Sequence, residues 1–149
     1  MKKWAGTLIA LLAVVAGGAF LWWQMSQSQA SLQLHGQRYH VSVMRTQAEL
    51  QKGLSGTDSL PEGQAMVFAF ASDSKWGMWM KDMNYPIDIV WLNSDRQVVY
   101  VVKNAQPSSY PDTTFKPDVP TRYVIELPSG TIERTGIAVG DAAGLPPGV

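Results

Sequence analysis

The sequence contains no cysteine, which excludes disulfides, thiolate metal sites and cysteine nucleophiles. It also has no excess of positive charge. Residues 24–149 carry ten basic and twelve acidic side chains, a net charge of about −2, so no basic surface is available to attract nucleic acid. We therefore expect partners other than DNA or RNA.

Two common enzyme signatures are missing as well. No G-x-S-x-G elbow occurs, and Gly53-x-x-Gly56 lacks the lysine and the strand-to-helix context of a phosphate-binding loop. A Ser-His-Asp triad stays open, because its members need not be adjacent in sequence. The sequence predicts no cofactor.

The longest hydrophobic run lies at the N-terminus. Residues 5–23 are nineteen residues without a charge, and at about 1.5 Å per residue they span roughly 28 Å, close to the hydrocarbon thickness of a bilayer. Lys2 and Lys3 precede the run, which favours a cytoplasmic N-terminus. We expect residues 1–23 to form a single-pass membrane anchor, residues 24–31 a polar linker, and residues 32–145 one extracytoplasmic domain.

A cleaved signal peptide is the alternative for the same segment. Ser28-Gln29-Ala30 offers small residues at the spacing that a signal peptidase recognises. The apolar run is longer than a typical signal-peptide core and ends in tryptophan, which favours the anchor. Both interpretations export the domain.

Local patterns in the domain predict a hairpin followed by one short helix. Residues 32–43 alternate between apolar and polar side chains around a central turn. Thr46 and Glu49 fit a capping box, and Gly53 or Gly56 is suited to end the helix.

Five further segments are rich in β-branched and aromatic residues and are bounded by turn residues, so each predicts a strand. They are residues 65–70, 76–81, 87–92, 97–102 and 122–127. The short connection between the third and fourth predicts an antiparallel pair. The expected fold is mainly β (α+β), a compact antiparallel sheet or barrel-like domain with one short helix. Residues 104–121 form a long proline-rich loop, which is a candidate lid or partner contact.

Charged residues inside the predicted strands are the main candidates for chemistry. Asp88 and Glu126 lie among apolar neighbours, and a buried carboxylate is costly unless it is paired or protonated. Lys81 is the nearest cation in sequence. The three residues could form a structural ion-pair cluster, or the two carboxylates could serve as the acid and base of an envelope hydrolase.

A second candidate is a methionine cluster. Met78, Met80 and Met83 form an M-x-M-x-x-M spacing, and thioether sulfurs are ligands for Cu(I). The competing interpretation is that these residues fill the core, because neither histidine nor cysteine lies nearby.

Short motifs recur along residues 41–142, and their order and spacing are specific. They are Lys52-Gly53-Leu54-Ser55-Gly56, Met66-Val67-Phe68, Trp79-Met80-Lys81-Asp82-Met83, Pro86-Ile87-Asp88-Ile89, Ser109-Tyr110-Pro111, Tyr123-Val124-Ile125-Glu126-Leu127 and Gly140-Asp141. Together they closely resemble the uncharacterised family called domain of unknown function 192 (DUF192). The resemblance implies a compact, mostly antiparallel β domain, often exported or membrane-tethered, and it supplies no established activity.

The chain departs from the family pattern at two informative positions. Thr57 stands where the family usually has arginine, so no anion clamp can be carried over to that position. Met78 stands where an aromatic residue is commoner.

The sequence as a whole favours a membrane-anchored binding or accessory module of the cell envelope, with a possible envelope protein or glycan as its partner. Whether the domain is an enzyme stays open. Aromatic side chains give large contact areas, so the expected binding residues are Trp76, Trp79, Lys81, Asp82 and Tyr110.

Overall fold

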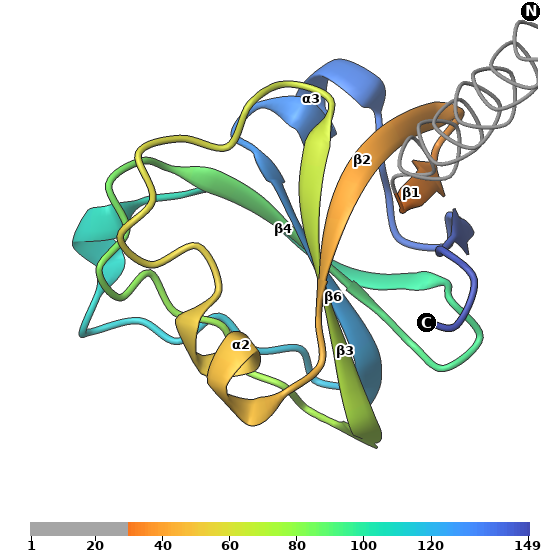
Figure 1. Cartoon of the computed structure of the whole chain (residues 1–149), viewed down its shortest axis with the longest axis horizontal. Helices are drawn as coiled ribbons and strands as arrows, with labels where there is room; N and C mark the ends of the chain where they lie inside the picture. The colour runs from red at the N-terminus through yellow and green to blue at the C-terminus, as the bar shows by residue number, and fades with distance from the viewer. Residues whose placement is uncertain (1–29) are drawn as a thin grey trace, which may run out of the picture.

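The computed structural model describes residues 30–149, which form one strongly curled seven-stranded sheet (Figure 1). The strand order is β5-β4-β6-β3-β2-β1-β7, and every pair is antiparallel except β2 with β3. The strands are β1 Ser31–Leu34, β2 Gln37–Met44, β3 Gln64–Ser74, β4 Ile87–Leu92, β5 Val98–Ala105, β6 Thr121–Pro128 and β7 Ala143–Gly144. The mainly β class predicted from the sequence is confirmed.

The curl brings the two edges of the sheet together at one end. Gln97, just before β5, forms an isolated antiparallel bridge with Ala142, just before β7. The amide of Ala143 donates to the carbonyl of Arg96 over 2.9 Å. The fold is therefore a half-barrel joined at one end.

The predicted hairpin and helix are both present. β1 and β2 pair antiparallel, and α2 spans Gln47–Lys52. The predicted capping box is confirmed, because Thr46 accepts from the amide of Glu49 while the Glu49 carboxylate accepts from the amide of Thr46. Gly53 ends the helix in a backbone conformation that favours glycine, with φ 47° and ψ −130°.

The expectation of a single helix is wrong, because a second short α-helix, α3, spans Thr131–Thr135. Glycines with positive φ, Gly130 and Gly136, flank it on both sides. A five-residue helix is too short to show a hydrophobic period, so no pattern in the sequence indicated it. A 3-10 turn, η1, covers Pro107–Ser109 in the long loop.

Four of the five later predicted strands are present, and β4 pairs antiparallel with β5 as expected. The strand predicted over 76–81 is wrong. That segment is extended but joins no sheet, and its single bridge links Met78 to Phe115 in the long loop. The membrane helix expected over 5–23 lies outside the described residues. Among the helices of residues 30–149, none has the length and apolar character needed to cross a bilayer.

Each face of the sheet carries its own hydrophobic core. One core fills the inside of the half-barrel and includes Leu32, Val67, Val90, Ile125 and Leu127. The other covers the opposite face and includes Leu54, Phe68, Ile89, Trp91 and Val124. All six residues of β4 are buried, because this strand has packed side chains on both faces.

Candidate functional site

The two carboxylates predicted to share a site lie on opposite faces of the sheet. In the antiparallel pair of β4 and β6, Asp88 is opposite Leu127 and Glu126 is opposite Ile89. Side chains alternate between faces along a strand, so Asp88 points into the core inside the half-barrel and Glu126 into the other core. The acid and base pair considered for a hydrolase is therefore not formed.

Asp88 is fully buried and has hydrogen-bond donors at both oxygens. Oδ1 accepts from the amide of Asn104 over 2.8 Å, and Oδ2 accepts from the amide of Ile132 over 2.7 Å. These contacts tie the end of β5 and the start of α3 to the centre of the sheet. Asp88 is a structural residue.

Glu126 is buried without such donors. Its neighbours across the sheet are Met66 on β3 and Ile89 on β4, both apolar. Only 4% of the residue is exposed, and Oε2 has no hydrogen-bond partner within residues 30–149. Burial raises the pKa of Glu126 to about 8, so the side chain is mostly protonated at neutral pH.

Lys81 does not pair with either carboxylate, and the expected ion-pair cluster is wrong. Its side chain is exposed, and no salt bridge found in residues 30–149 includes it. The prediction relied on closeness in sequence, but residues 81–86 form turns and bends between Lys81 and the start of β4. The Lys81 carbonyl instead accepts from Ser55 Oγ over 2.8 Å.

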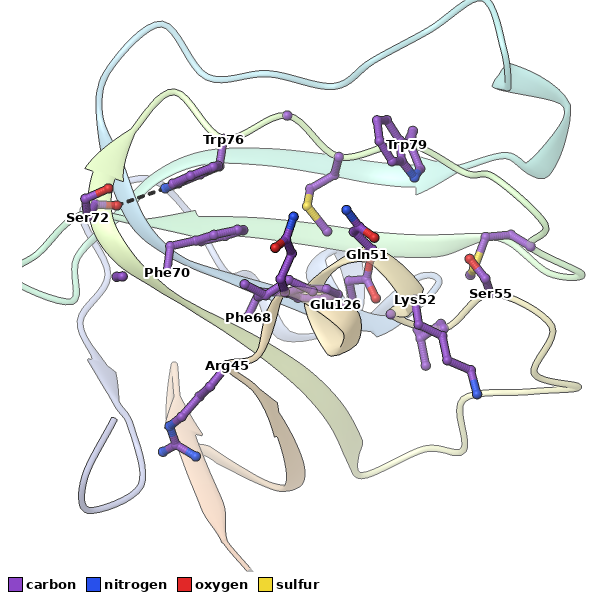
Figure 2. A pocket seen from close by; sticks show the side chains of 18 residues that line it. Arg45, Gln51, Lys52, Ser55, Phe68, Phe70, Ser72, Trp76, Trp79 and Glu126 are labelled. Atoms are coloured by element: carbon purple, nitrogen blue, oxygen red, sulfur yellow. Dashed lines mark hydrogen bonds between the residues drawn. The ribbon is translucent and has the colours of Figure 1, made fainter.

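Glu126 lies at the base of an open pocket of about 470 Å³ (Figure 2). α2 and the turn after it form one side, and the end of β3 with the extended segment 76–79 forms the other. Apolar and aromatic side chains supply most of the lining, among them Leu50, Phe68, Phe70, Trp76, Met78 and Trp79.

Two stacked aromatic rings form one wall of the pocket. Phe70 and Trp76 stack with centroids 4.1 Å apart and an interplanar angle of 9°. The Trp76 indole donates to the carbonyl of Ser72 over 3.1 Å, as Figure 2 shows. The buried Trp91 donates to the carbonyl of Trp76 over 2.8 Å and so fastens this segment to the sheet.

The opposite rim is held by hydrogen bonds to backbone carbonyls, where residues 55–57 meet residues 81–84. Gly56 donates its amide to the carbonyl of Asp82 over 2.8 Å, beside the bond from Ser55 to Lys81. Asn84 donates to the carbonyl of Thr57 over 2.8 Å. The motif 52–56 therefore owes its position to the motif 79–83, and both support the pocket.

These motifs belong to one recognised family. The family model of DUF192, described as "Uncharacterized ACR", matches residues 30–144. The chain belongs to the DUF192 family. The comparison with curated proteins found no match.

Two solved structures share the fold of this DUF192 domain. A protein of unknown function from Novosphingobium aromaticivorans DSM 12444 is 29% identical, with a TM-score of 0.72, over 76% of this chain and 83% of that chain. A protein described as "a putative transcription regulator" from Sinorhizobium meliloti 1021 is 25% identical, with a TM-score of 0.72, over 78% of this chain and 92% of that chain. Neither description names a ligand.

The structure brings together only part of the binding site expected for the DUF192 domain. Trp76 and Trp79 line the pocket, whereas Lys81, Asp82 and Tyr110 lie outside it. Trp79 is 50% exposed and Tyr110 42% exposed, so both are accessible to a partner. The prediction did not include α2 or Phe70. The apolar side chains of Leu50, just before the 52–56 motif, and of Leu54, within it, were the signal that could have placed α2 there.

The three methionines are not all at the pocket. Met78 and Met83 line it, whereas Met80 is buried in the core and does not. In residues 30–149 no group of three histidine, cysteine or acidic side chains could hold a metal ion. The arrangement fits the interpretation of these methionines as apolar packing.

Proposed function

We propose that this DUF192 domain is a binding module whose site is the pocket between α2 and residues 76–79. The observation that carries the proposal is the unpartnered carboxyl of Glu126 at the base of an open, mainly apolar cavity. Pockets of this kind, apolar with few convergent polar groups, are typical of small-ligand sites. The ligand would have an apolar body and one polar group that meets Glu126.

The energetics support this function. A buried polar group without a hydrogen bond costs about 1–3 kcal/mol, and a ligand that supplies the missing partner recovers part of that cost. Phe70 and Trp76 add a flat, preorganised surface, since their stacking and the bond from Trp76 to Ser72 fix both rings. Little ordering of the protein would be needed on binding.

The composition of the pocket favours binding over acid and base catalysis. Glu126 is the single carboxylate among the described residues that line the pocket, and no histidine lines it. Two-carboxylate hydrolysis needs a second acid roughly 5–9.5 Å away, and Asp88 lies on the opposite face of the sheet.

The proposed site of action is outside the cytoplasm, with the domain tethered to the membrane by residues 1–23. The uncharged run 5–23, preceded by Lys2 and Lys3, supports this proposal. The ligand would then be a free small molecule of the envelope or a group carried by an envelope protein or glycan. Added protease should digest the domain in spheroplasts with intact membranes. Protection until the membrane is lysed would contradict this placement.

Binding at the pocket can be tested by methyl NMR of the full chain in nanodiscs. With methionine methyls labelled, fragments with an apolar body and one polar group should shift Met78 and Met83, which line the pocket. Met44 packs against the same core without lining the pocket and is the internal control. Phe70→Ala should weaken the shifts. If no fragment moves Met78 or Met83 selectively, the proposed function is wrong.

A further inference from the structure

We propose that the pocket binds an alkylammonium group, with Glu126 as its counter-ion and the aromatic rings of Phe70 and Trp76 beside it. This inference rests on the proposed function and specifies the chemistry of the ligand. Free amines and lysine side chains share this chemistry.

The first argument is the unused hydrogen-bonding capacity of Glu126. An ionised carboxylate is an acceptor only and can take several donors, yet Oε2 has none within residues 30–149. Asp88 shows what the fold does when a buried carboxylate has a structural role, since backbone amides meet both of its oxygens. An ammonium group brings three donors and the opposite charge, and thus supplies what Glu126 lacks.

The second argument is the nature of the walls. Aromatic faces attract cations, and tryptophan is the strongest of them. Phe70, Trp76 and Trp79 line the same cavity as Glu126, so a cation in the pocket would meet aromatic rings as well as a carboxyl. The acid and the aromatic walls disfavour an anionic ligand, and the charged ends of Arg45 and Lys52 point away from Glu126.

The third argument is that no cation of residues 30–149 pairs with Glu126. Arg45 and Lys52 are the basic residues that line the pocket, and Figure 2 shows both carrying their charged ends away from Glu126. No salt bridge of the described residues includes Glu126. The position of a counter-ion is therefore unfilled by the described residues.

Binding of an ammonium group should release a proton. Free Glu126 is mostly protonated at pH 7 because burial raises its pKa to about 8, and the ligand favours the ionised form. Arg45 and Lys52 line the same pocket as Glu126. Tyr85 is also coupled to Glu126: its pKa is raised mainly by burial and slightly by the charge of Glu126. Proton release of nearly one per ligand at pH 7 should fall as the pH exceeds 8.

The test is calorimetry of the full chain in nanodiscs with three probes: n-pentylammonium, neutral 1-pentanol, and Nα-acetyl-lysine amide. We expect n-pentylammonium to bind at least about tenfold more tightly than 1-pentanol. Titrations in buffers of different ionisation enthalpy should detect the released proton. The lysine amide distinguishes the source: tighter binding than n-pentylammonium supports a peptide-borne ammonium, and weaker binding supports a free amine.

Variants separate this inference from the proposed function. Glu126→Gln should reduce the preference for ammonium over pentanol by at least about tenfold and abolish proton release. Phe70→Leu keeps an apolar side chain and should reduce the preference by about threefold. Glu133→Gln changes an exposed carboxylate outside the pocket and should leave the preference for ammonium unchanged.

Two outcomes would contradict these expectations. If pentanol binds as tightly as the amine and shifts Met78 and Met83, the inference is wrong and the proposed function stands. Absence of binding by every probe and fragment would overturn both.

Discussion

The two faces of the sheet treat a buried carboxyl group in opposite ways. On the face inside the half-barrel, Asp88 accepts hydrogen bonds from two backbone amides and so joins β4 to β5 and α3. On the other face, Glu126 has apolar neighbours, no partner at Oε2, and a pocket above it. Burial alone therefore does not reveal whether a carboxyl group is structural. The donors that surround it do.

The largest expected effect comes from matched amide substitutions of the two carboxyl groups. Asp88→Asn replaces one acceptor oxygen with a donor, so one buried amide loses its partner, and the free energy of unfolding should fall by about 2–4 kcal/mol. Glu126→Gln removes the cost of keeping this acid protonated in the folded chain at pH 7, so the free energy of unfolding should rise rather than fall. Urea unfolding of both variants measures the difference. Equal losses would remove the distinction between the faces.

The pH dependence of stability should be the next largest effect. The pKa of Glu126 is about 8 in the folded chain against an ordinary value of 4.5, so between these values the folded state binds a proton that the unfolded state releases. Stability therefore falls as the pH rises through this window, by up to about 1.4 kcal/mol per pH unit. Urea unfolding at pH 5.5 and pH 7.5 measures it.

Glu126→Gln is the control for this pH dependence. The slope should disappear in the variant, because glutamine does not titrate. Glu49 and Asp141 have lowered pKa values owing to backbone hydrogen bonds, from Arg45 and Ala138 respectively. Their stabilisation is present above the ordinary carboxyl pKa and is lost only at more acidic pH. A slope that persists in the variant would place its origin elsewhere.

A smaller effect tests the wall of the pocket. Gly53 and Gly56 both have positive φ, but a Cβ at Gly53 would lie 3.0 Å from Phe68 Cζ, whereas a Cβ at Gly56 would meet nothing within 4 Å. Gly56→Ala should cost about 1 kcal/mol through backbone strain alone. Gly53→Ala should cost at least about 2 kcal/mol, because its φ of 47° with ψ of −130° favours glycine and because Phe68 must also move. Thermal unfolding compares the two, and equal costs would show that the contact with Phe68 is not tight.

Local signals in the sequence predicted much of the fold. The Thr46 and Glu49 capping box depends on residues three apart, and the alternation around Asp88 and Glu126 marked two real strands. The segment 76–81 has strand-like residues, but its bridge partner, Phe115, is far along the chain. Pairing over such a distance leaves no local pattern.

The candidate site was predictable only in part, for the same reason. The sequence indicated that Asp88 and Glu126 were buried and that each needed a donor or a proton. It could not show that the β4 and β6 register places them on opposite faces. Lys81 was close in sequence to Asp88 yet lies outside both cores, and Phe70 meets Trp76 only because the chain folds back after β3.

The central claim is that Glu126 is a protonated, unpartnered carboxyl at the base of a ligand pocket. NMR titration of its side-chain carboxyl carbon in the full chain in nanodiscs, assigned with Glu126→Gln, measures the protonation directly. The predicted midpoint is near pH 8, and it should move to lower pH when n-pentylammonium is present. A midpoint near the ordinary glutamate value of 4.5, unchanged by the amine, would contradict the account.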